Sequence, residues 1–413
     1  MEKAIKLVER IDQEDKEIHS FLEEPGRQAR LDLMIAQNAT KNSTEPLPLS
    51  GQYFGLKDIF HYDGLPTNAG SHLPAEVLRG VQGECVTKIE EAGAILLGKT
   101  ATTEFAYFEP SRTRNPRNID HSPGGSSSGS AAAVAIGLCD FAVGTQTVGS
   151  IIRPAAYCGV VGFKPSYGRV ETSGLIYFSP SVDTIGFFAE SVEGVGRVAS
   201  VVCSDWRDVK DITNVRIGMP KGSYMQQCSQ EGQDHFYSQI RTIEIAGFPV
   251  IELDVFPDIA AVNSDHRALI ASEVALVHSE WFELYRALYR PKTTEIIKEG
   301  MTIKPSDAQL IRENKVRRQN NFESFMDDNG IEIWLSPSAT GPAPLGLIHT
   351  GDPCMNLPWS FLGVPALNIP VGSFSNGLPG GLQCTARLGS DEELIAWGSE
   401  FHKILPATMS NHD

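Results

Sequence analysis

The spacing of apolar residues changes along the chain and divides it into three regions. Residues 1–45 have apolar side chains at near-helical spacing, interrupted by a Pro-Gly pair at 25–26. Between residues 53 and 186, short apolar runs alternate with segments rich in Gly, Ser and Pro, and longer helical patterns return after residue 205. The first region is predicted to pack as helices. The chemistry is expected in the second region, because functional side chains concentrate on loops between rigid elements.

Strands and helices are predicted to alternate through the rest of the chain. A helix over 75–92 precedes a buried strand at 94–97, and an Ala-rich helix over 130–138 precedes a strand at 141–143. Ser306 and Gln309 have the spacing of a capping box at a helix start. With no linker or repeat, residues 1–413 are expected to form one α/β domain with helices on both faces of its sheet. Beyond residue 205, the pattern predicts strands at 215–219, 249–255 and 331–335 and helices over 259–290 and 306–327.

Composition narrows the classes of partner. The 413 residues include 51 acidic and 35 basic ones, a net charge of −16, so neither nucleic acid nor an anionic membrane is expected to bind. The charged segment 1–11 lacks the apolar core of a signal peptide, and no run of about 18 apolar residues occurs, so the protein is expected to be cytoplasmic. Seven cysteines without a CxxC pair and ten histidines without HExxH spacing predict no metal site.

The segment 93–100 reads Gly-Ala-Ile-Leu-Leu-Gly-Lys-Thr and matches the phosphate-loop pattern GxxxxGK[ST]. A phosphate loop must turn successive backbone N–H groups toward the phosphate. The four residues between the glycines are apolar and favour a strand instead. Lys99 is therefore expected to end a strand, and nucleotide binding is the weaker alternative.

A second motif, Gly-Ser-Ser-Ser-Gly at 125–129, matches the GxSxG nucleophile elbow of α/β-hydrolases, with Ser127 as the nucleophile. The elbow requires a strand immediately before the serine. The preceding residues are His-Ser-Pro-Gly, which predict a turn. An esterase that uses Ser127 is therefore kept only as an alternative.

Three other segments are better candidates for a site, and they contain Lys57, Ser126 and Ser150. The Ala-rich helix follows the Gly-Gly-Ser-Ser stretch without a gap, so Ser126 is expected at or near a helix N-terminus. Residues 147–150 follow a strand, and their consecutive backbone N–H groups can converge on one oxyanion. Taken alone, each serine would more often be a helix cap and the lysine a solvated charge. The segments read Gly-Leu-Lys-Asp at 55–58, Gly-Gly-Ser-Ser-Ser-Gly at 124–129 and Thr-Val-Gly-Ser at 147–150.

Together these segments resemble the amidase signature family. The family's marks are a lysine in G-x-K-D, the Gly-Gly-Ser-Ser stretch, and a second serine followed by Pro-Ala-Ala and Cys-Gly, found here at 154–156 and 158–159. Ser126 and Ser150 are 24 positions apart, as is usual in the family. The resemblance leaves out residues 1–45 and the region 205–330, where a variable, substrate-side part is expected. It implies the amidase-signature fold, with a large, twisted, mixed β-sheet covered by helices on both faces.

The resemblance also implies a Ser-Ser-Lys triad that needs no cofactor. Ser150 attacks the carbonyl of a small amide, Ser126 passes the proton, and neutral Lys57 receives it; water then hydrolyses the acyl-enzyme. A lysine has an ordinary pKa near 10.4, so Lys57 must be buried to act as a base near neutral pH. The family further implies a cis peptide bond at Ser126. The implied oxyanion hole consists of the backbone N–H groups of Thr147, Val148, Gly149 and Ser150.

Two departures from the family pattern concern the substrate. Val148 stands where the family usually has glycine, and a positive φ would be strongly unfavourable for this β-branched residue. Arg153 matches a malonamidase-like subset that also shares Gly-Thr-Gln-Thr at 144–147. Arg153 and Gln146 are therefore the candidate substrate-binding residues. Arg153 either binds the carboxylate of a small half-amide or pairs with an internal carboxylate.

Other functions stay open at this point. Within the family, a glutamine-hydrolysing amidotransferase subunit that supplies ammonia to a partner is the main alternative. An inactive scaffold with the same fold is another. The sequence is also compatible with a homodimer.

Overall fold

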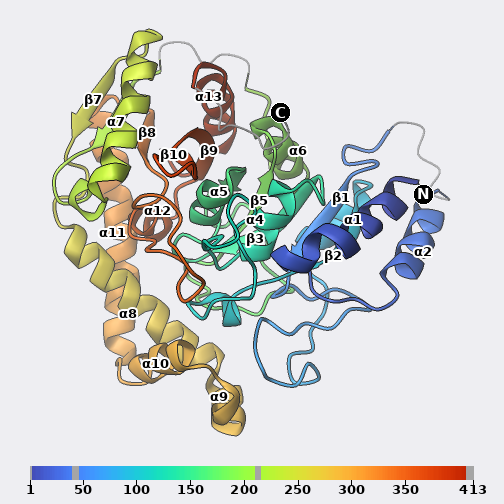
Figure 1. Ribbon diagram of the computed structural model, residues 1–413. Coiled ribbons are helices and arrows are strands. Elements are labelled where there is room, and N and C mark those ends of the chain that lie inside the picture. Colours follow the sequence, from blue (N-terminus) through green and yellow to red (C-terminus); the bar gives the residue numbers. More distant parts are fainter. Residues whose placement is uncertain (1, 40–45, 210–214, 406–413) are drawn as a thin grey trace.

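A mixed β-sheet runs through the centre of the computed structural model (Figure 1). The structure describes residues 2–39, 46–209 and 215–405. Within these ranges ten strands form one sheet, in the order β2-β1-β3-β5-β4-β9-β10-β8-β6-β7. The strands are β1 (Tyr53–Lys57), β2 (Ile95–Thr100), β3 (Phe141–Gln146), β4 (Val161–Lys164), β5 (Thr184–Ala189), β6 (Ile217–Pro220), β7 (Val250–Leu253), β8 (Ile333–Pro337), β9 (Ala366–Ser373) and β10 (Pro379–Ala386).

The pairing of the strands brings two carboxyl ends to one edge of the sheet. β1 lies between β2 and β3 and is parallel to both, and β6 is parallel to its neighbours β7 and β8. The strands between these two groups pair antiparallel. Lys57 is the last residue of β1 and Gln146 the last of β3. Because the two strands are parallel neighbours, the residues that follow them meet at the same edge, where open α/β sheets bind ligands.

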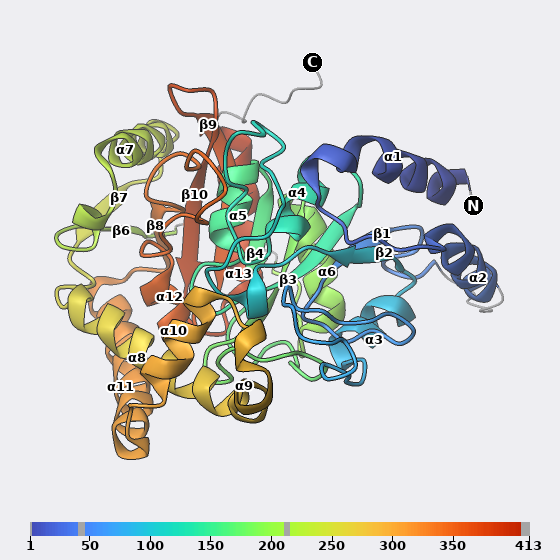
Figure 2. The same cartoon turned by 60° about the horizontal axis from the view of Figure 1, so that its bottom comes forward.

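Helices cover both faces of the sheet, as predicted (Figure 2). α4 and α5 pack on one face, and α6 and α13 pack on the other. The helices are α1 (Glu2–Ile18), α2 (Arg27–Ala39), α3 (Glu84–Glu91), α4 (Ser128–Ala135), α5 (Ile152–Cys158), α6 (Val192–Val202), α7 (Gln230–Ile245), α8 (Ile259–Val277), α9 (Ser279–Tyr285), α10 (Pro291–Gly300), α11 (Pro305–Asn329), α12 (Leu357–Leu362) and α13 (Asp391–Ile404).

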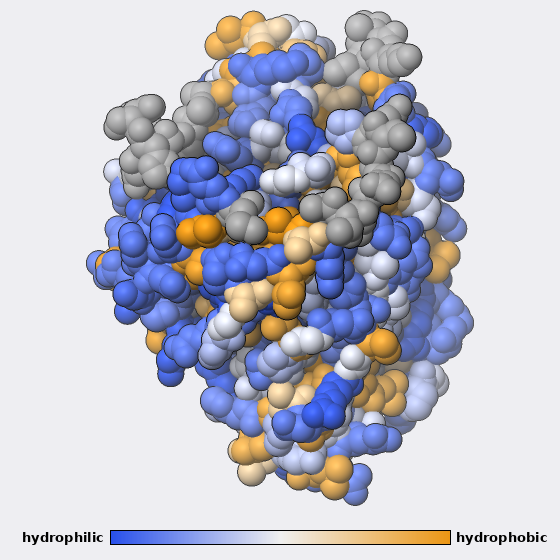
Figure 3. All heavy atoms as spheres, turned by 90° about the vertical axis from the view of Figure 1, so that its right-hand side faces the viewer, coloured by the Kyte–Doolittle hydropathy of each residue, from blue (hydrophilic) through white to orange (hydrophobic). Residues whose placement is uncertain are grey.

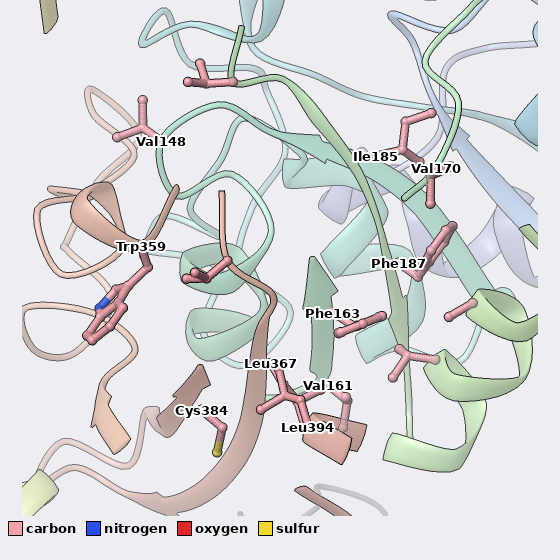
Figure 4. Close-up of a cluster of buried hydrophobic side chains, with 14 of the residues drawn as sticks. Val148, Val161, Phe163, Val170, Ile185, Phe187, Trp359, Leu367, Cys384 and Leu394 are labelled. Carbon is pink, nitrogen blue, oxygen red and sulfur yellow. The ribbon is translucent and has the colours of Figure 1, made fainter. Parts of the chain in front are cut away.

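The central strands supply side chains to two apolar cores. Phe141 and Val143 of β3 belong to one buried cluster, and Ala142 between them belongs to the other. Burial on both faces explains why the apolar runs in the sequence are continuous and not alternating. Figure 4 shows part of the larger cluster, in which Phe163 and Phe187 lie in the sheet.

One face of the molecule is mainly polar. Figure 3 shows a face on which hydrophilic residues dominate and apolar residues form small, separate patches. In the part of the chain that the structure describes, no helix has the length and apolar character needed to cross a membrane.

Two predicted helices are shorter in the structure. The helix expected over 75–92 is confined to α3, which begins at Glu84. Gly80 lies so close to His61 that a Cβ there would overlap the imidazole ring, so this segment packs as a turn-rich stretch. The pattern over 259–290 is divided at His278 into α8 and α9, and the buried His278 ring lies edge-on to Phe105.

The predicted capping box is wrong. Pro305 occupies the first turn of α11, so Lys304 is the N-cap and Ser306 lies inside the helix. Proline favours this position because it has no N–H to leave unpaired. The predicted strands after residue 205 are confirmed as β6, β7 and β8 with shifts at their ends, whereas β9 and β10 lie in the Pro- and Gly-rich region where none was predicted.

Candidate active site

Three segments that are remote in the chain meet at the edge formed by β1 and β3. Lys57 ends β1, Ser126 lies two residues before α4, and Ser150 lies between β3 and α5. Ser126 and Ser150 line one cavity together with Thr147, Val148 and Gly149. The sequence prediction that Ser126 lies near a helix N-terminus is confirmed.

Lys57 is buried completely and contacts Ser126. Its Nζ lies 2.7 Å from Ser126 Oγ and 2.8 Å from Thr145 Oγ1. Burial lowers the pKa of Lys57 to about 7, while the nearby carboxylate of Asp183 acts in the opposite direction. A substantial fraction of this side chain is therefore a neutral amine near pH 7, which is the state that a general base requires.

The segment around Ser126 is held tightly against its neighbours. The Gly125–Ser126 peptide bond is cis, as the family resemblance implied. A Cβ on Gly129 would lie 2.3 Å from the carbonyl oxygen of Ser20, so only glycine allows the two backbones to approach this closely. Ser127 is fully buried and donates its hydroxyl hydrogen to the carbonyl of Thr145.

Residues 147–150, called the nucleophile loop below, present unpaired backbone donors. Within the part of the chain that the structure describes, no backbone or side-chain acceptor is bonded to the N–H of Val148, Gly149 or Ser150. Consecutive free N–H groups beside a hydroxyl are the arrangement that stabilises an oxyanion. Val148 is not among the residues with positive φ, so the strain considered for valine at this position does not arise.

Asp183 is a buried residue that sequence reasoning missed. It precedes β5, the antiparallel neighbour of β3, and its Oδ1 accepts a hydrogen bond from Thr147 Oγ1 over 2.5 Å. Its Oδ2 accepts from the N–H groups of Phe178 and Ser179, both over 2.8 Å. Burial raises the pKa of Asp183 to about 6. This carboxylate therefore connects the nucleophile loop to the Phe178 wall of the cavity.

Arg153 lines the same cavity and has unused donors. Its Nη2 donates to Gly125 O over 2.7 Å and to Thr350 Oγ1 over 3.2 Å, while Nε and Nη1 have no partner among the described residues. Burial lowers the pKa of Arg153, but a guanidinium stays charged in proteins. The structure thus gives Arg153 no bonded internal carboxylate, which was one of the two roles considered for it.

Gln146 does not lie where a substrate-binding residue would. Its side chain is fully buried, its Oε1 accepts from the N–H groups of Ile151 and Ile152, and its Nε2 donates to Ser360 Oγ. Gln146 is not among the residues that line the cavity. It instead bonds the first N–H groups of α5, a role that a helix N-cap side chain usually fills.

The cavity is small and has aromatic walls. Its free space is about 10 Å³, which is about enough for one water molecule. Tyr107 and Phe178 stack on one another at 5.0 Å and form part of the wall.

The two competing motifs are not sites in the structure. Residues 95–100 form β2, so the phosphate-loop pattern has no loop, and Lys99 instead lies 3.0 Å from Asp58 in a buried ion pair. No strand immediately precedes Ser127, which does not line the cavity. Among the described residues, no group of three or more His, Cys, Asp or Glu side chains is placed to hold a metal ion.

Comparisons with known proteins identify the family. A family model described as Amidase matches residues 4–395 and so also covers the region 205–330 that the sequence motifs left out. A glutamyl-tRNA(Gln) amidotransferase subunit of Legionella pneumophila (strain Paris) is 30% identical over 442 residues, which cover 93% of this chain and 89% of that protein.

Solved structures give the same result. The crystal structure of an amidase superimposes with a TM-score of 0.87 and 26% identity over 98% of this chain and 95% of that one. A peptide amidase in complex with the competitive inhibitor chymostatin superimposes with a TM-score of 0.84 and 25% identity, over 100% and 95%. The chain therefore belongs to the amidase family, and it is an enzyme that hydrolyses a carbon–nitrogen amide bond.

Proposed function

We propose that this chain is a serine amidase that converts a small amide to a carboxylic acid and ammonia or an amine. The observation that carries the proposal is the buried Lys57 amine 2.7 Å from Ser126 Oγ, because Ser126 lines the same cavity as Ser150. Both ends of a proton relay are therefore present. No metal or other cofactor takes part in the proposed steps.

The reaction proceeds through an acyl-enzyme. Ser150 Oγ attacks the carbonyl carbon, its proton passes to Ser126, and the Ser126 proton passes to neutral Lys57. The carbonyl oxygen becomes an oxyanion beside the N–H groups of the nucleophile loop. The carbon–nitrogen bond breaks as the leaving nitrogen takes the proton back through Ser126. Water then attacks the ester by the same relay, which releases the acid and regenerates the Ser150 hydroxyl.

We further propose a substrate that bears a carboxylate, as in the malonamidase-like subset. The support is Arg153, which lines the cavity with two nitrogens that lack acceptors. An unpaired buried guanidinium is unfavourable, and a bound carboxylate would satisfy it with charge-assisted hydrogen bonds. A short half-amide such as a malonamate carries its carboxylate close to the amide.

Arg153→Gln is expected to lower kcat/KM for a half-amide at least about tenfold more than for a neutral amide of equal length, since a hydrogen bond to a charged group contributes about 1.5–3 kcal/mol. The ratio of the two kcat/KM values is the measurement, because Arg153 also bonds Gly125 beside Ser126 and its loss affects every substrate. Glutamine retains a donor for Gly125, and Arg153→Ala is the comparison without one. Equal losses on both substrates would exclude the carboxylate role and leave the amidase function standing.

Glutamine hydrolysis for a partner protein is the second candidate. It is favoured by the similarity to the glutamyl-tRNA(Gln) amidotransferase subunit, and glutamine also carries a carboxylate that Arg153 could bind. Release of ammonia from glutamine and from none of the half-amides in a panel would support this candidate over the first. Release from half-amides in the absence of any partner protein would support the first.

Asp183→Asn is expected to shift the pH dependence of kcat/KM. The base must be neutral, so activity rises with pH as Lys57 loses its proton, and the Asp183 carboxylate raises the pKa of Lys57. Removing this charge lowers that pKa, and the acid limb of the profile moves to lower pH. Thr147→Val is the comparison, because it keeps the carboxyl group but removes a hydrogen bond that lowers the pKa of Asp183, so its acid limb should move in the same direction by a smaller amount. A limb that stays in place in Asp183→Asn, or moves to higher pH, contradicts the proposed base.

A further inference from the structure

Two side chains from distant segments bind the carbonyl groups of the nucleophile loop. His266 Nε2 donates to Thr147 O over 3.1 Å, and Ser360 Oγ donates to Val148 O over 2.6 Å. His266 belongs to α8 and Ser360 to α12, and these two helices pack against one another. The loop is therefore held from its outer side by elements that follow it by more than a hundred residues.

The direction of these carbonyls determines the direction of the next N–H groups. In a trans peptide unit the C=O and the following N–H point in opposite directions. Among the described residues, the cis bond is at Gly125–Ser126, so the peptide bonds that follow Thr147 and Val148 are trans. The N–H of Val148 thus points away from His266, and the N–H of Gly149 points away from Ser360. Val148 and Gly149 line the cavity, and neither of their N–H groups is bonded to an acceptor in the described part of the chain.

We infer that His266 and Ser360 are positioning residues that orient the N–H groups of the oxyanion hole. By binding the carbonyls of Thr147 and Val148, they turn the N–H groups of Val148 and Gly149 toward the atom on which negative charge develops. The inference rests on the proposed function, because it requires an oxyanion at this loop. It also gives α8, in the region expected to vary with substrate, a part in the chemical step itself.

Neighbouring contacts fix the hydrogen atoms of both donors. Ser360 Oγ accepts from Gln146 Nε2 over 2.9 Å, which directs the Ser360 hydrogen to Val148 O. A carbonyl oxygen can only accept, so the His266 ring carries a hydrogen on Nε2. Burial lowers the pKa of His266 to about 4, so the ring is neutral at pH 7. The edge of Phe361, with ring centres 5.7 Å apart, holds the imidazole in place.

The expected effect is on the chemical step and not on substrate binding. Donors that are fixed before the reaction stabilise the oxyanion without reorganising, and a planar substrate carbonyl uses them less than a tetrahedral intermediate does. A loop with misdirected N–H groups should therefore bind substrate normally and turn it over slowly. A residue with only a packing role would change stability without this separation.

Four variants test the inference. His266→Phe keeps a planar ring and removes the donor, while His266→Gln keeps an N–H donor near the position of Nε2. We expect His266→Phe to lower kcat about ten- to a hundredfold with KM within about threefold of wild type. The affinity for an aldehyde analogue, to which the Ser150 hydroxyl adds to give a tetrahedral adduct, should fall in parallel with kcat. His266→Gln should recover most of the lost kcat and most of the lost aldehyde affinity. Ser360→Ala, which removes the hydroxyl donor, should show the same two losses, and Ser360→Thr, which keeps the hydroxyl, should recover them.

Several results would overturn the inference. They are an unchanged kcat in both His266→Phe and Ser360→Ala, equal damage in the donor-retaining variants, or a loss of kcat without a loss of aldehyde affinity. Melting temperatures identify a variant that does not fold, in which case the Ser360 pair decides. The proposed function fails in a different way, since Ser150→Ala would then retain turnover in an enzyme whose His266 is intact.

Discussion

Lys57→Met is expected to lose about 10³-fold or more of kcat/KM above pH 7, where the wild-type amine is neutral, because methionine removes the base and leaves the volume of the side chain nearly unchanged. The residual rate should show no acid limb near pH 7. Wild type should show one, since burial lowers the pKa of Lys57 to about 7. The measurement is kcat/KM between pH 5 and pH 10 for both proteins, with ammonia release as the readout.

The same variant is expected to be more stable than wild type at pH 6. In the unfolded chain Lys57 has its ordinary pKa near 10.4, so between about pH 7 and pH 10 the unfolded state binds more protons and stability rises with pH. Below pH 7 the folded protein contains the buried charge, a penalty on the order of 4 kcal/mol. Lost hydrogen bonds to Ser126 and Thr145 offset part of the gain.

Thermal unfolding measures this linkage directly. The melting temperature of Lys57→Met should exceed that of wild type at pH 6, and the difference should shrink as the pH approaches 10. Thr145→Val provides the control, because it removes one hydrogen bond of Lys57 without removing the amine. A difference that stays constant with pH would mean that Lys57 keeps its ordinary pKa in the folded protein.

Ser150→Ala is expected to lower kcat about 10⁴-fold or more, since single losses within a serine triad have effects of this size. Ser127→Ala is the matched control, because this serine is also buried but lies outside the cavity, where its Oγ bonds the backbone C=O and N–H of Thr145. It should retain most of the activity. The opposite result, with Ser127 essential and Ser150 dispensable, would favour the esterase alternative.

Local sequence signals were sufficient for part of the site. The Gly-Gly-Ser-Ser stretch followed by alanines predicted that Ser126 lies near a helix N-terminus, and α4 begins at Ser128. The requirement that Lys57 be buried followed from the pKa that a base needs, and the side chain has no exposed surface. Such features depend on residues close in sequence or on one chemical requirement.

Features that depend on long-range packing could not be predicted. Asp183 meets Thr147 only because β5 pairs antiparallel with β3. Its one local signal is a carboxylate directly before an apolar strand. His266 reaches the nucleophile loop only because α8 packs on α12. Gln146 was a candidate for substrate contact as part of the Gly-Thr-Gln-Thr segment, but the end of β3 directs it toward Ser360 and α5.

The most direct test of the account is to locate the acyl group during turnover. Wild-type enzyme is mixed with a half-amide, quenched in acid within milliseconds, digested and analysed by mass spectrometry. The account predicts an added acyl mass on the peptide that contains Ser150. This mass should be absent from Ser150→Ala, and it should accumulate in a variant in which hydrolysis of the acyl-enzyme is slow. An acyl mass on Ser126 or Ser127, or turnover without any acylated peptide in such a variant, would contradict it.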